Sequence, residues 1–271
     1  MSVHKDAKRI TTQVVYEMKQ NGEKISMLTA YDYTMAKIVD QAGIDIILVG
    51  DSASNVMAGH ETTLPITLDQ MIYHAQAVVR AAKRALVVVD LPFGTYQGNS
   101  KEALNSAIRI MKESGAHAVK LEGGREVRES IERILSAGIP VMGHLGLTPQ
   151  SIYKFGTYTV RAKEEEEAQI LKEDSKMLSE IGCFSVVFEK IPAKLAADVT
   201  AEIDCPTIGI GASKHCDGQI LVSDDMLGMS NYYPKFVKKY SNLKKIINKS
   251  IKNYTKDVKS RRFPYSKNVY K

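Results

Sequence analysis

The sequence has few cysteines and no long apolar run. Its three cysteines, Cys183, Cys205 and Cys216, are too few for a disulfide framework and lack the close pairs of a zinc motif. The longest apolar runs, such as residues 44–50, are far shorter than the roughly 20 residues that span a bilayer. We therefore expect buried or incidental thiols and no membrane segment.

The first thirty residues also lack the features of a secretory signal. They carry several lysines but neither a continuous apolar stretch nor a small-residue cleavage site, and a signal peptide needs both. The expected location is therefore cytoplasmic.

Glycine motifs that bind phosphate are absent as well. No Gly-x-Gly-x-x-Gly follows the first predicted strand and no Gly-x-x-x-x-Gly-Lys-Ser/Thr occurs, so neither a dinucleotide-binding fold nor a P-loop is indicated. The composition is that of an ordinary globular protein, with 44% hydrophobic and 25% charged residues. Since one (β/α)8 barrel needs about 250 residues, we expect a single domain over residues 1–271. It would have an N-terminal extension to about residue 23 and a basic C-terminal helix and tail from about residue 234.

Positive charge is concentrated at the C-terminus. Residues 235–271 contain 13 Lys and Arg against one acid, Asp257, a net charge of +12, whereas the whole chain carries +6. Apolar residues recur there at steps of three and four from Phe236 to Val258, which predicts an amphipathic helix with lysines on its outer face. We favour a docked terminal helix over a surface that binds RNA, anionic lipid or a polyanionic substrate, because such charge runs are usually solvated faces.

From residue 24 onward, short apolar runs alternate with longer segments of helical spacing. Strands are predicted at residues 25–30, 44–50, 85–90, 116–122, 140–145, 184–189 and 206–211, with a weaker eighth at 219–222. Helices are predicted at residues 35–42, 68–82, 101–114, 126–137, 165–181 and 193–202. Regular βα units with apolar strands indicate a parallel sheet covered by helices, either closed or open and doubly wound. The number of strands favours closure, so the predicted fold class is α/β, a (β/α)8 TIM barrel.

Polar side chains occur repeatedly where these strands end. They are Asp51, Ser52, Asp90, Lys120, Glu122, His144 and Glu189. The carboxyl ends of parallel barrel strands share one face, where barrel enzymes build their sites. Buried acids need a partner or a metal, and several oxygen ligands favour Mg²⁺, although an added imidazole leaves room for Mn²⁺, Co²⁺ or Zn²⁺. Each acid taken alone could equally be a strand-end cap or part of a structural ion pair. His60, His74 and His117 lie away from strand ends and are interpreted as structural or surface residues.

Several sequence blocks, in order, resemble ketopantoate hydroxymethyltransferases, also called 3-methyl-2-oxobutanoate hydroxymethyltransferases. The blocks are residues 24–32, 48–52, 63–67 (Thr-Leu-Pro-Ile-Thr), 90–93 (Asp-Leu-Pro-Phe), 119–124 (Val-Lys-Leu-Glu-Gly-Gly), 143–150 (Gly-His-Leu-Gly-Leu-Thr-Pro-Gln), 209–212 and 217–222. Ordered blocks from about residue 8 to Pro264 are far more specific than one motif. The resemblance implies a barrel of the phosphoenolpyruvate/pyruvate type, commonly a homodecamer, acting in pantothenate and coenzyme A synthesis.

The resemblance also implies a reaction and a role for each candidate residue. Asp51, Asp90 and Glu122 look like the Mg²⁺ site, with Glu122 acting directly or through water. Ser52, Lys120 and His144 would line the pocket for 3-methyl-2-oxobutanoate together with Asp51 and Asp90, and Glu189 looks like the catalytic base. A metal-stabilised enolate would attack the methylene carbon of the cosubstrate 5,10-methylenetetrahydrofolate, giving 2-dehydropantoate and tetrahydrofolate.

Two other functions are weighed against this one. A metal-dependent carbon-carbon lyase or mutase on the same barrel would share the enolate chemistry but not the folate. A nucleic-acid-binding protein would use the basic C-terminal segment, and its binding would be salt-sensitive. We expect small-molecule substrates and a homo-oligomer, with no nucleic acid or membrane partner.

The sequence departs from the family pattern at three places. Residues 53–55 (Ala-Ser-Asn) replace a Leu-Gly-Met type of segment. Thr157, Arg161 and Ala162 stand where Gly-Gly-Tyr-x-Val-Gln-Gly is expected, and Ser213 replaces a frequent glycine. We expect these changes to affect folate affinity or loop motion more than metal chemistry.

Overall fold

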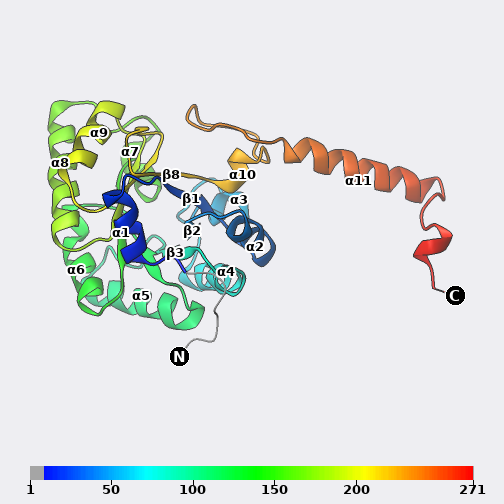
Figure 1. The fold of residues 1–271 in the computed structure, drawn as a ribbon, viewed down its shortest axis with the longest axis horizontal. Helices are drawn as coiled ribbons and strands as arrows, with labels where there is room; N and C mark the ends of the chain where they lie inside the picture. Colours follow the sequence, from blue (N-terminus) through cyan, green and yellow to red (C-terminus); the bar gives the residue numbers. More distant parts are fainter. Residues whose placement is uncertain (1–8, 271) are drawn as a thin grey trace. The chain divides into compact units, whose positions relative to one another are not determined.

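The computed structural model describes residues 9–270, and the chain divides into two compact units. The first unit ends at Val222 and the second begins at Ser223. The first unit is a closed barrel of eight parallel strands with helices between them (Figure 1). The predicted TIM barrel is therefore confirmed.

All eight predicted strands form, and each pairs with its neighbours in chain order. The strands are β1 (Ile25–Thr29), β2 (Ile46–Val49), β3 (Leu86–Asp90), β4 (Ala118–Lys120), β5 (Val141–Gly146), β6 (Ser185–Glu189), β7 (Thr207–Ile210) and β8 (Gly218–Leu221). The weakest prediction, β8, closes the barrel by pairing with both β7 and β1. Its sequence pattern predicts a strand only weakly, because Gln219 interrupts its short apolar run.

The helices follow the predicted ranges closely. They are α2 (Tyr33–Gln41), α4 (Leu68–Ala81), α5 (Ser100–Ser114), α6 (Arg128–Ser136), α8 (Glu165–Glu180) and α9 (Ala193–Glu202). Local signals set their ends, as in α4, where Thr67 and Gln70 form a reciprocal capping box. The segment predicted as one helix over residues 126–137 instead begins with the 3₁₀ turn η1 (Arg125–Val127) before α6.

Short helical turns at the carboxyl ends of β2 and β5 were not predicted. They are α3 (Ala53–Val56), η2 (Pro149–Ser151) and α7 (Ile152–Phe155). Helix α1 (Thr12–Gln20) lies in the expected N-terminal extension, and its Val15 and Met18 pack in the same apolar cluster as inward-facing barrel residues. Helix α1 is therefore part of the fold.

Strand periodicity explains why the candidate residues share one space. Val88, Ala118, Met142 and Val187 belong to the apolar cluster inside the barrel. Side chains two residues further along a strand face the same way. Asp90, Lys120, His144 and Glu189 each follow one of these core residues by two positions, so the apolar interior becomes a polar site at the carboxyl ends of the strands.

The second unit contains α10 (Ser223–Met226), α11 (Leu243–Lys259) and η3 (Ser266–Asn268). The predicted amphipathic helix is thus shorter than expected, because Phe236 and Tyr240 precede it. No residue of α11 is buried, so the docking of this helix stays a prediction. Among residues 9–270, no helix is long and apolar enough to cross a membrane.

Candidate active site

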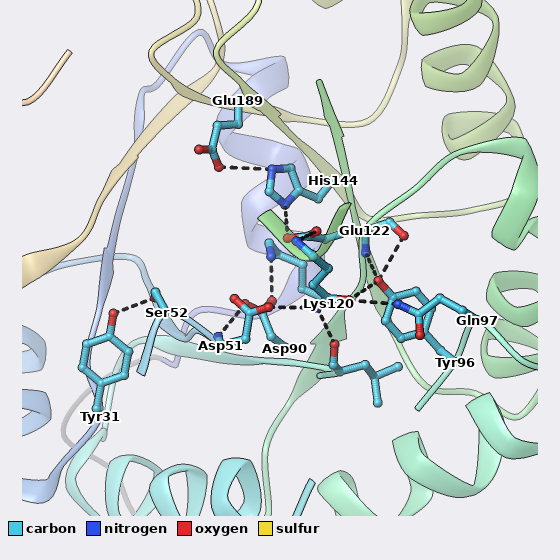
Figure 2. Close-up of polar contacts among 12 residues, drawn as sticks. Tyr31, Asp51, Ser52, Asp90, Tyr96, Gln97, Lys120, Glu122, His144 and Glu189 are labelled. Carbon is cyan, nitrogen blue, oxygen red and sulfur yellow. Dashed lines mark hydrogen bonds and ion pairs between the residues drawn. The ribbon is translucent and has the colours of Figure 1, made fainter. Parts of the chain in front are cut away.

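Six of the seven candidate residues meet at the mouth of the barrel. Figure 2 shows carboxylates from four strand ends around two basic side chains. The six are Asp51, Asp90, Lys120, Glu122, His144 and Glu189. All except Glu189 are buried, and the side chain of Glu189 is 15% exposed. A buried polar cluster that reaches solvent through one partly exposed side chain has the arrangement of a binding site.

Asp90 anchors one side of this cluster. Its Oδ1 atom lies 2.7 Å from the Nζ atom of Lys120, and its Oδ2 atom accepts a hydrogen bond from the backbone N–H of Asp51 at 3.0 Å. A Cβ atom at position 50 would lie 2.8 Å from Ser52 Oγ and 3.5 Å from Asp90 Oδ2. Gly50 therefore provides the room in which Ser52 and Asp90 approach the turn after β2.

His144 lies between two carboxylates. Its Nδ1 atom is 3.3 Å from Glu122 Oε1, and its Nε2 atom is 3.4 Å from Glu189 Oε2. Neither contact has hydrogen-bond geometry, so these are close ion-pair contacts. Burial and the charge of Lys120 lower the pKa of His144, but the two carboxylates outweigh them and raise it to about 9. The imidazole is thus cationic at neutral pH.

Negative charge exceeds positive charge in this space. Burial, followed by the charges of Asp90 and Glu122, raises the pKa of Asp51 well above its usual value. Burial opposes the charge on Lys120, but the surrounding carboxylates raise its pKa, so it stays protonated. Four acidic side chains face one ammonium and one imidazolium, and a divalent cation bound among them would favour the ionised form of Asp51 and balance the negative charge.

The donor chemistry fits Mg²⁺, although no complete cage is present. Among residues 9–270, no three His, Cys, Asp or Glu side chains are arranged so that they could hold a metal by themselves. Mg²⁺ is usually bound through one or two carboxylates while it keeps several waters. Asp51 and Asp90 offer such a pair. Glu122 accepts a hydrogen bond from the backbone N–H of Gln150 and faces His144 with its other oxygen, which suits contact through water.

Ser52 lies at the edge of the cluster. Its Oγ atom is 2.8 Å from the hydroxyl of Tyr31, and Figure 2 shows it turned toward that residue. The three other histidines considered above lie outside the cluster. His60 is exposed, His74 contacts the backbone oxygen of Tyr31, and His117 accepts a hydrogen bond from the backbone N–H of Val87.

Two buried residues of the cluster, Gln150 and Tyr96, were missed by the sequence reasoning. Gln150 Nε2 donates to Asp51 Oδ2 at 2.9 Å, and the Tyr96 hydroxyl lies 2.7 Å from Gln150 Oε1. Burial, followed by the charge of Glu122, raises the pKa of Tyr96, which keeps the hydroxyl protonated. Both residues come from loops, and a neutral side chain gives no charge signal. The block at residues 143–150 was the available clue for Gln150.

A cavity of about 480 Å³ lies beside the cluster. Its lining includes Gly123, which directly follows Glu122, and Gly146, the last residue of β5, two positions after His144. Arg161 and Ala162, two of the positions that depart from the family pattern, also line it. The guanidinium of Arg161 lies 4.1 Å from the centre of the Phe155 ring, another lining residue.

Comparison with known protein families gives one clear match. Residues 9–266 match the family model described as ketopantoate hydroxymethyltransferase. A protein of Flavobacterium johnsoniae named 3-methyl-2-oxobutanoate hydroxymethyltransferase is 70% identical, with 98% of each chain covered. Proteins of the same name from Christiangramia forsetii and Parabacteroides distasonis are 68% and 66% identical, covering 98% and 100% of each chain.

Solved structures of similar fold belong to more distant proteins. A phosphonopyruvate hydrolase in complex with oxalate and Mg²⁺ aligns with a TM-score of 0.62 at 9% identity, covering 95% of this chain and 92% of its own. A 2,3-dimethylmalate lyase, described as a member of the PEP mutase/isocitrate lyase superfamily, aligns with a TM-score of 0.59 at 12% identity, covering 96% and 91%. At such low identity, these likenesses show the fold alone, a (β/α)8 barrel.

Proposed function

The chain belongs to the ketopantoate hydroxymethyltransferase family and is a transferase, and from this premise we propose the reaction that its buried site performs. It transfers a hydroxymethyl group from 5,10-methylenetetrahydrofolate to 3-methyl-2-oxobutanoate. The products are 2-dehydropantoate and tetrahydrofolate, and the step belongs to pantothenate synthesis. Family membership favours this reaction over the lyase or mutase alternative, and nucleic-acid binding rests on C-terminal charge alone.

The observation that carries the proposal is the excess of carboxylates around Lys120 and His144. An oxo acid brings a carboxylate and a ketone, and a base must remove a weakly acidic proton from C3. The cluster supplies a cationic side chain, candidate metal ligands and a separate carboxylate, Glu189, whose side chain is the most exposed of the six.

In this proposal, Asp51 and Asp90 would hold Mg²⁺, and Glu122 would contribute through water. When bound, the ion would supply positive charge that stabilises the negative charge developing on the ketone oxygen as the C3 proton leaves. Lys120 and Ser52 hold the carboxylate and oxo group of the substrate, and Lys120 is kept in place by its 2.7 Å contact with Asp90.

Glu189 acts as the general base. Its carboxylate takes the C3 proton, and the electron pair left on C3 forms the bond to the methylene carbon of the folate. The methylene carbon is bonded to two folate nitrogens: one carbon-nitrogen bond breaks as the carbon-carbon bond forms, and one water replaces the second nitrogen. The water oxygen becomes the hydroxyl of the product, and tetrahydrofolate leaves with its two nitrogens protonated, one by the proton from C3 and one by a proton from the water. His144 lines the pocket, and its Nε2 atom, 3.4 Å from Glu189 Oε2, orients that carboxylate.

The cavity beside the cluster is a candidate place for the folate, since ligand pockets usually enclose about 300–1,000 Å³ and this one has about 480 Å³. Its lining by Arg161 and Ala162 makes the departures from the family pattern relevant to folate affinity. The role of Ser213, the cytoplasmic location and the homodecamer stay predictions.

A product assay tests the proposed reaction. The purified chain is incubated with 3-methyl-2-oxobutanoate, 5,10-methylenetetrahydrofolate and Mg²⁺, and 2-dehydropantoate is quantified by mass spectrometry. We expect product only when both substrates are present, and loss of product with EDTA. Equal turnover of phosphonopyruvate or a methylisocitrate-like acid without folate would instead support the lyase or mutase alternative.

A further inference from the structure

Gln150 is the residue that joins the carboxylates of this site to one another. It is 5% exposed and lies in the turn η2 after β5. Its Nε2 atom donates to Asp51 Oδ2 at 2.9 Å and to the backbone oxygen of Leu91 at 3.0 Å. Its backbone N–H donates to Glu122 Oε2 at 2.9 Å. One residue thus connects the loops that follow β2, β3, β4 and β5.

The orientation of the Gln150 amide is fixed by its neighbours. The Tyr96 hydroxyl accepts from the backbone N–H of Glu122 at 3.1 Å, and two acceptors lie near its own proton: Gln150 Oε1 at 2.7 Å and the backbone oxygen of Glu122 at 3.2 Å. Gln150 Oε1 is the nearer acceptor. Gln97 Nε2 also donates to Gln150 Oε1, at 3.0 Å, and the Gln97 amide is itself oriented by the backbone N–H of Gly94. A flipped Gln150 amide would place oxygen against two acceptors and nitrogen against a donor.

We propose that Gln150 is a positioning residue of the active site, which sets Asp51 through its side-chain amide and Glu122 through its backbone N–H, with Tyr96 fixing the amide. This inference rests on the proposed function. Among residues 9–270, Gln150 is the hydrogen-bond donor to the Asp51 carboxylate, and its Nε2 atom donates to the Oδ2 atom of Asp51. The Oδ1 atom of Asp51 is thereby left to bind a cation. Groups that orient ligands in this way typically change metal affinity or activity by about 10–100-fold when replaced.

Packing alone does not explain this arrangement. An apolar side chain of similar volume would fill the same space, and it would avoid burying an amide that needs four partners. Both polar atoms of the Gln150 side chain and its backbone N–H have partners, and two of those partners are carboxylates that we propose for metal binding. A residue that only packs would affect stability without affecting cation affinity.

The test compares Gln150→Met and Tyr96→Phe with the control Gln76→Met. Met keeps the length of the side chain and the backbone N–H while removing the amide, and Phe removes a single hydroxyl. Gln76 is a partly exposed glutamine on α4 whose Nε2 atom donates to the backbone oxygen of Glu113. Mn²⁺ affinity is measured by electron paramagnetic resonance without substrate. Tm, kcat and the KM for the oxo acid are measured in parallel.

We expect Gln150→Met to weaken Mn²⁺ binding by about 10–100-fold and to lower kcat, with Gln76→Met unchanged. Tyr96→Phe should act in the same direction, and the double variant should lose less than the product of the two single effects, because Tyr96 acts partly through Gln150. Mn²⁺ affinity and kcat equal to those of the unmodified chain in either single variant would overturn the inference. If Gln150→Met fails to fold, the Mn²⁺ affinity and kcat of Tyr96→Phe test the inference instead. An unmodified chain that binds Mn²⁺ but forms no product would refute the proposed function while still testing Gln150.

Discussion

At the scale of single residues, the site depends on charges that water does not screen. Lys120 and Asp90 have side chains only 5% and 3% exposed. Attraction between such charges is strong in a low-dielectric interior, and an unpaired buried charge is costly. Changes to one partner should therefore affect both folding and chemistry.

Replacement of Lys120 by Met is expected to leave Asp90 buried beside two other acids without its cation. We expect the free energy of unfolding to fall by about 3–5 kcal/mol, as for other broken buried pairs. Urea denaturation measures it. The matched control is Lys194→Met, which removes an exposed ion pair with Asp198 on α9 and should change stability little. Equal effects of the two variants would contradict the role given to Lys120.

Replacement of Glu189 by Gln is expected to separate binding from proton removal. The affinities for the oxo acid and for Mn²⁺ should stay within a few-fold of those of the unmodified chain. Deuterium exchange at C3 should slow by about 10²–10⁴-fold, the usual contribution of a general base. Isothermal titration calorimetry and NMR measure the two properties. Glu202→Gln, at the end of α9, is the control. Exchange at the unmodified rate in Glu189→Gln would rule out this base.

The sequence predicted the charged members of the cluster because acids and lysines at the ends of apolar strands are conspicuous. Asp90, Lys120, His144 and Glu189 follow core residues by two positions, so strand periodicity alone places them together. Gln150 and Tyr96 could not be found in this way. Their positions depend on how the loops after β3 and β5 fold back, and short-range patterns do not encode that.

At the scale of elements, β5 and β6 meet at a glycine that no other residue can replace easily. Gly146 has φ +94°, and a Cβ atom there would lie 2.4 Å from the backbone oxygen of Glu189. Gly146→Ala should therefore displace Glu189, and lower both Tm and C3 exchange strongly. Gly138→Ala has a similar φ of +82° but nothing within 4 Å of its Cβ, so only backbone strain of about 1–2 kcal/mol is expected. Similar losses in both variants would contradict this account.

His117 joins β3 to β4 by accepting the backbone N–H of Val87. Burial, followed by the charge of Arg9, lowers its pKa to about 4, whereas an unfolded histidine titrates near 6.5. The unfolded state therefore binds more protons between these values. The stability that His117 contributes is fully present above about pH 6.5 and is lost as the pH falls to about 4.

His117→Asn should flatten this part of the stability profile, because the Asn oxygen can accept the same N–H without titrating. The difference in unfolding free energy between pH 7 and pH 4 should shrink by up to about 3 kcal/mol. His60→Asn, at an exposed position, should leave the profile unchanged. Urea denaturation at a series of pH values measures the unfolding free energy. If its slope against pH is the same in His117→Asn as in the unmodified chain, His117 is not the source of this pH dependence.

The sequence predicted strands and helices well because both periodicities are strong in a (β/α)8 barrel. Their ends were harder to place. The strand predicted over residues 116–122 forms only at Ala118–Lys120, since Glu122 turns away to meet Gln150 and the first helix positions after it form a 3₁₀ turn.

At the scale of the whole molecule, the exposed apolar face of α11 is the main feature whose partner the sequence did not predict. Ile247, Ile251, Tyr254 and Val258 recur along one face and are 43–60% exposed. Periodicity shows that a helix has an apolar face, but it does not show what covers that face. Contiguous exposed apolar surface of this kind usually marks an interface.

The predicted homo-oligomer can be tested through this face. Light scattering of the unmodified chain should give a mass well above the 30.0 kDa of one chain. Replacing Ile247 and Ile251 by Ser should lower that mass, and Lys249→Ser, a substitution on the same helix, should not. A monomeric unmodified chain would contradict the prediction.

The central claim is that the buried carboxylates at the barrel mouth support metal-assisted proton removal from an oxo acid. Proton NMR in D₂O tests it directly, by following exchange at C3 of 3-methyl-2-oxobutanoate with Mg²⁺ and then with EDTA. We expect rapid exchange with Mg²⁺, loss with EDTA and recovery when excess Mg²⁺ is added. Exchange no faster than in protein-free buffer, from folded protein saturated with Mg²⁺, would contradict the claim.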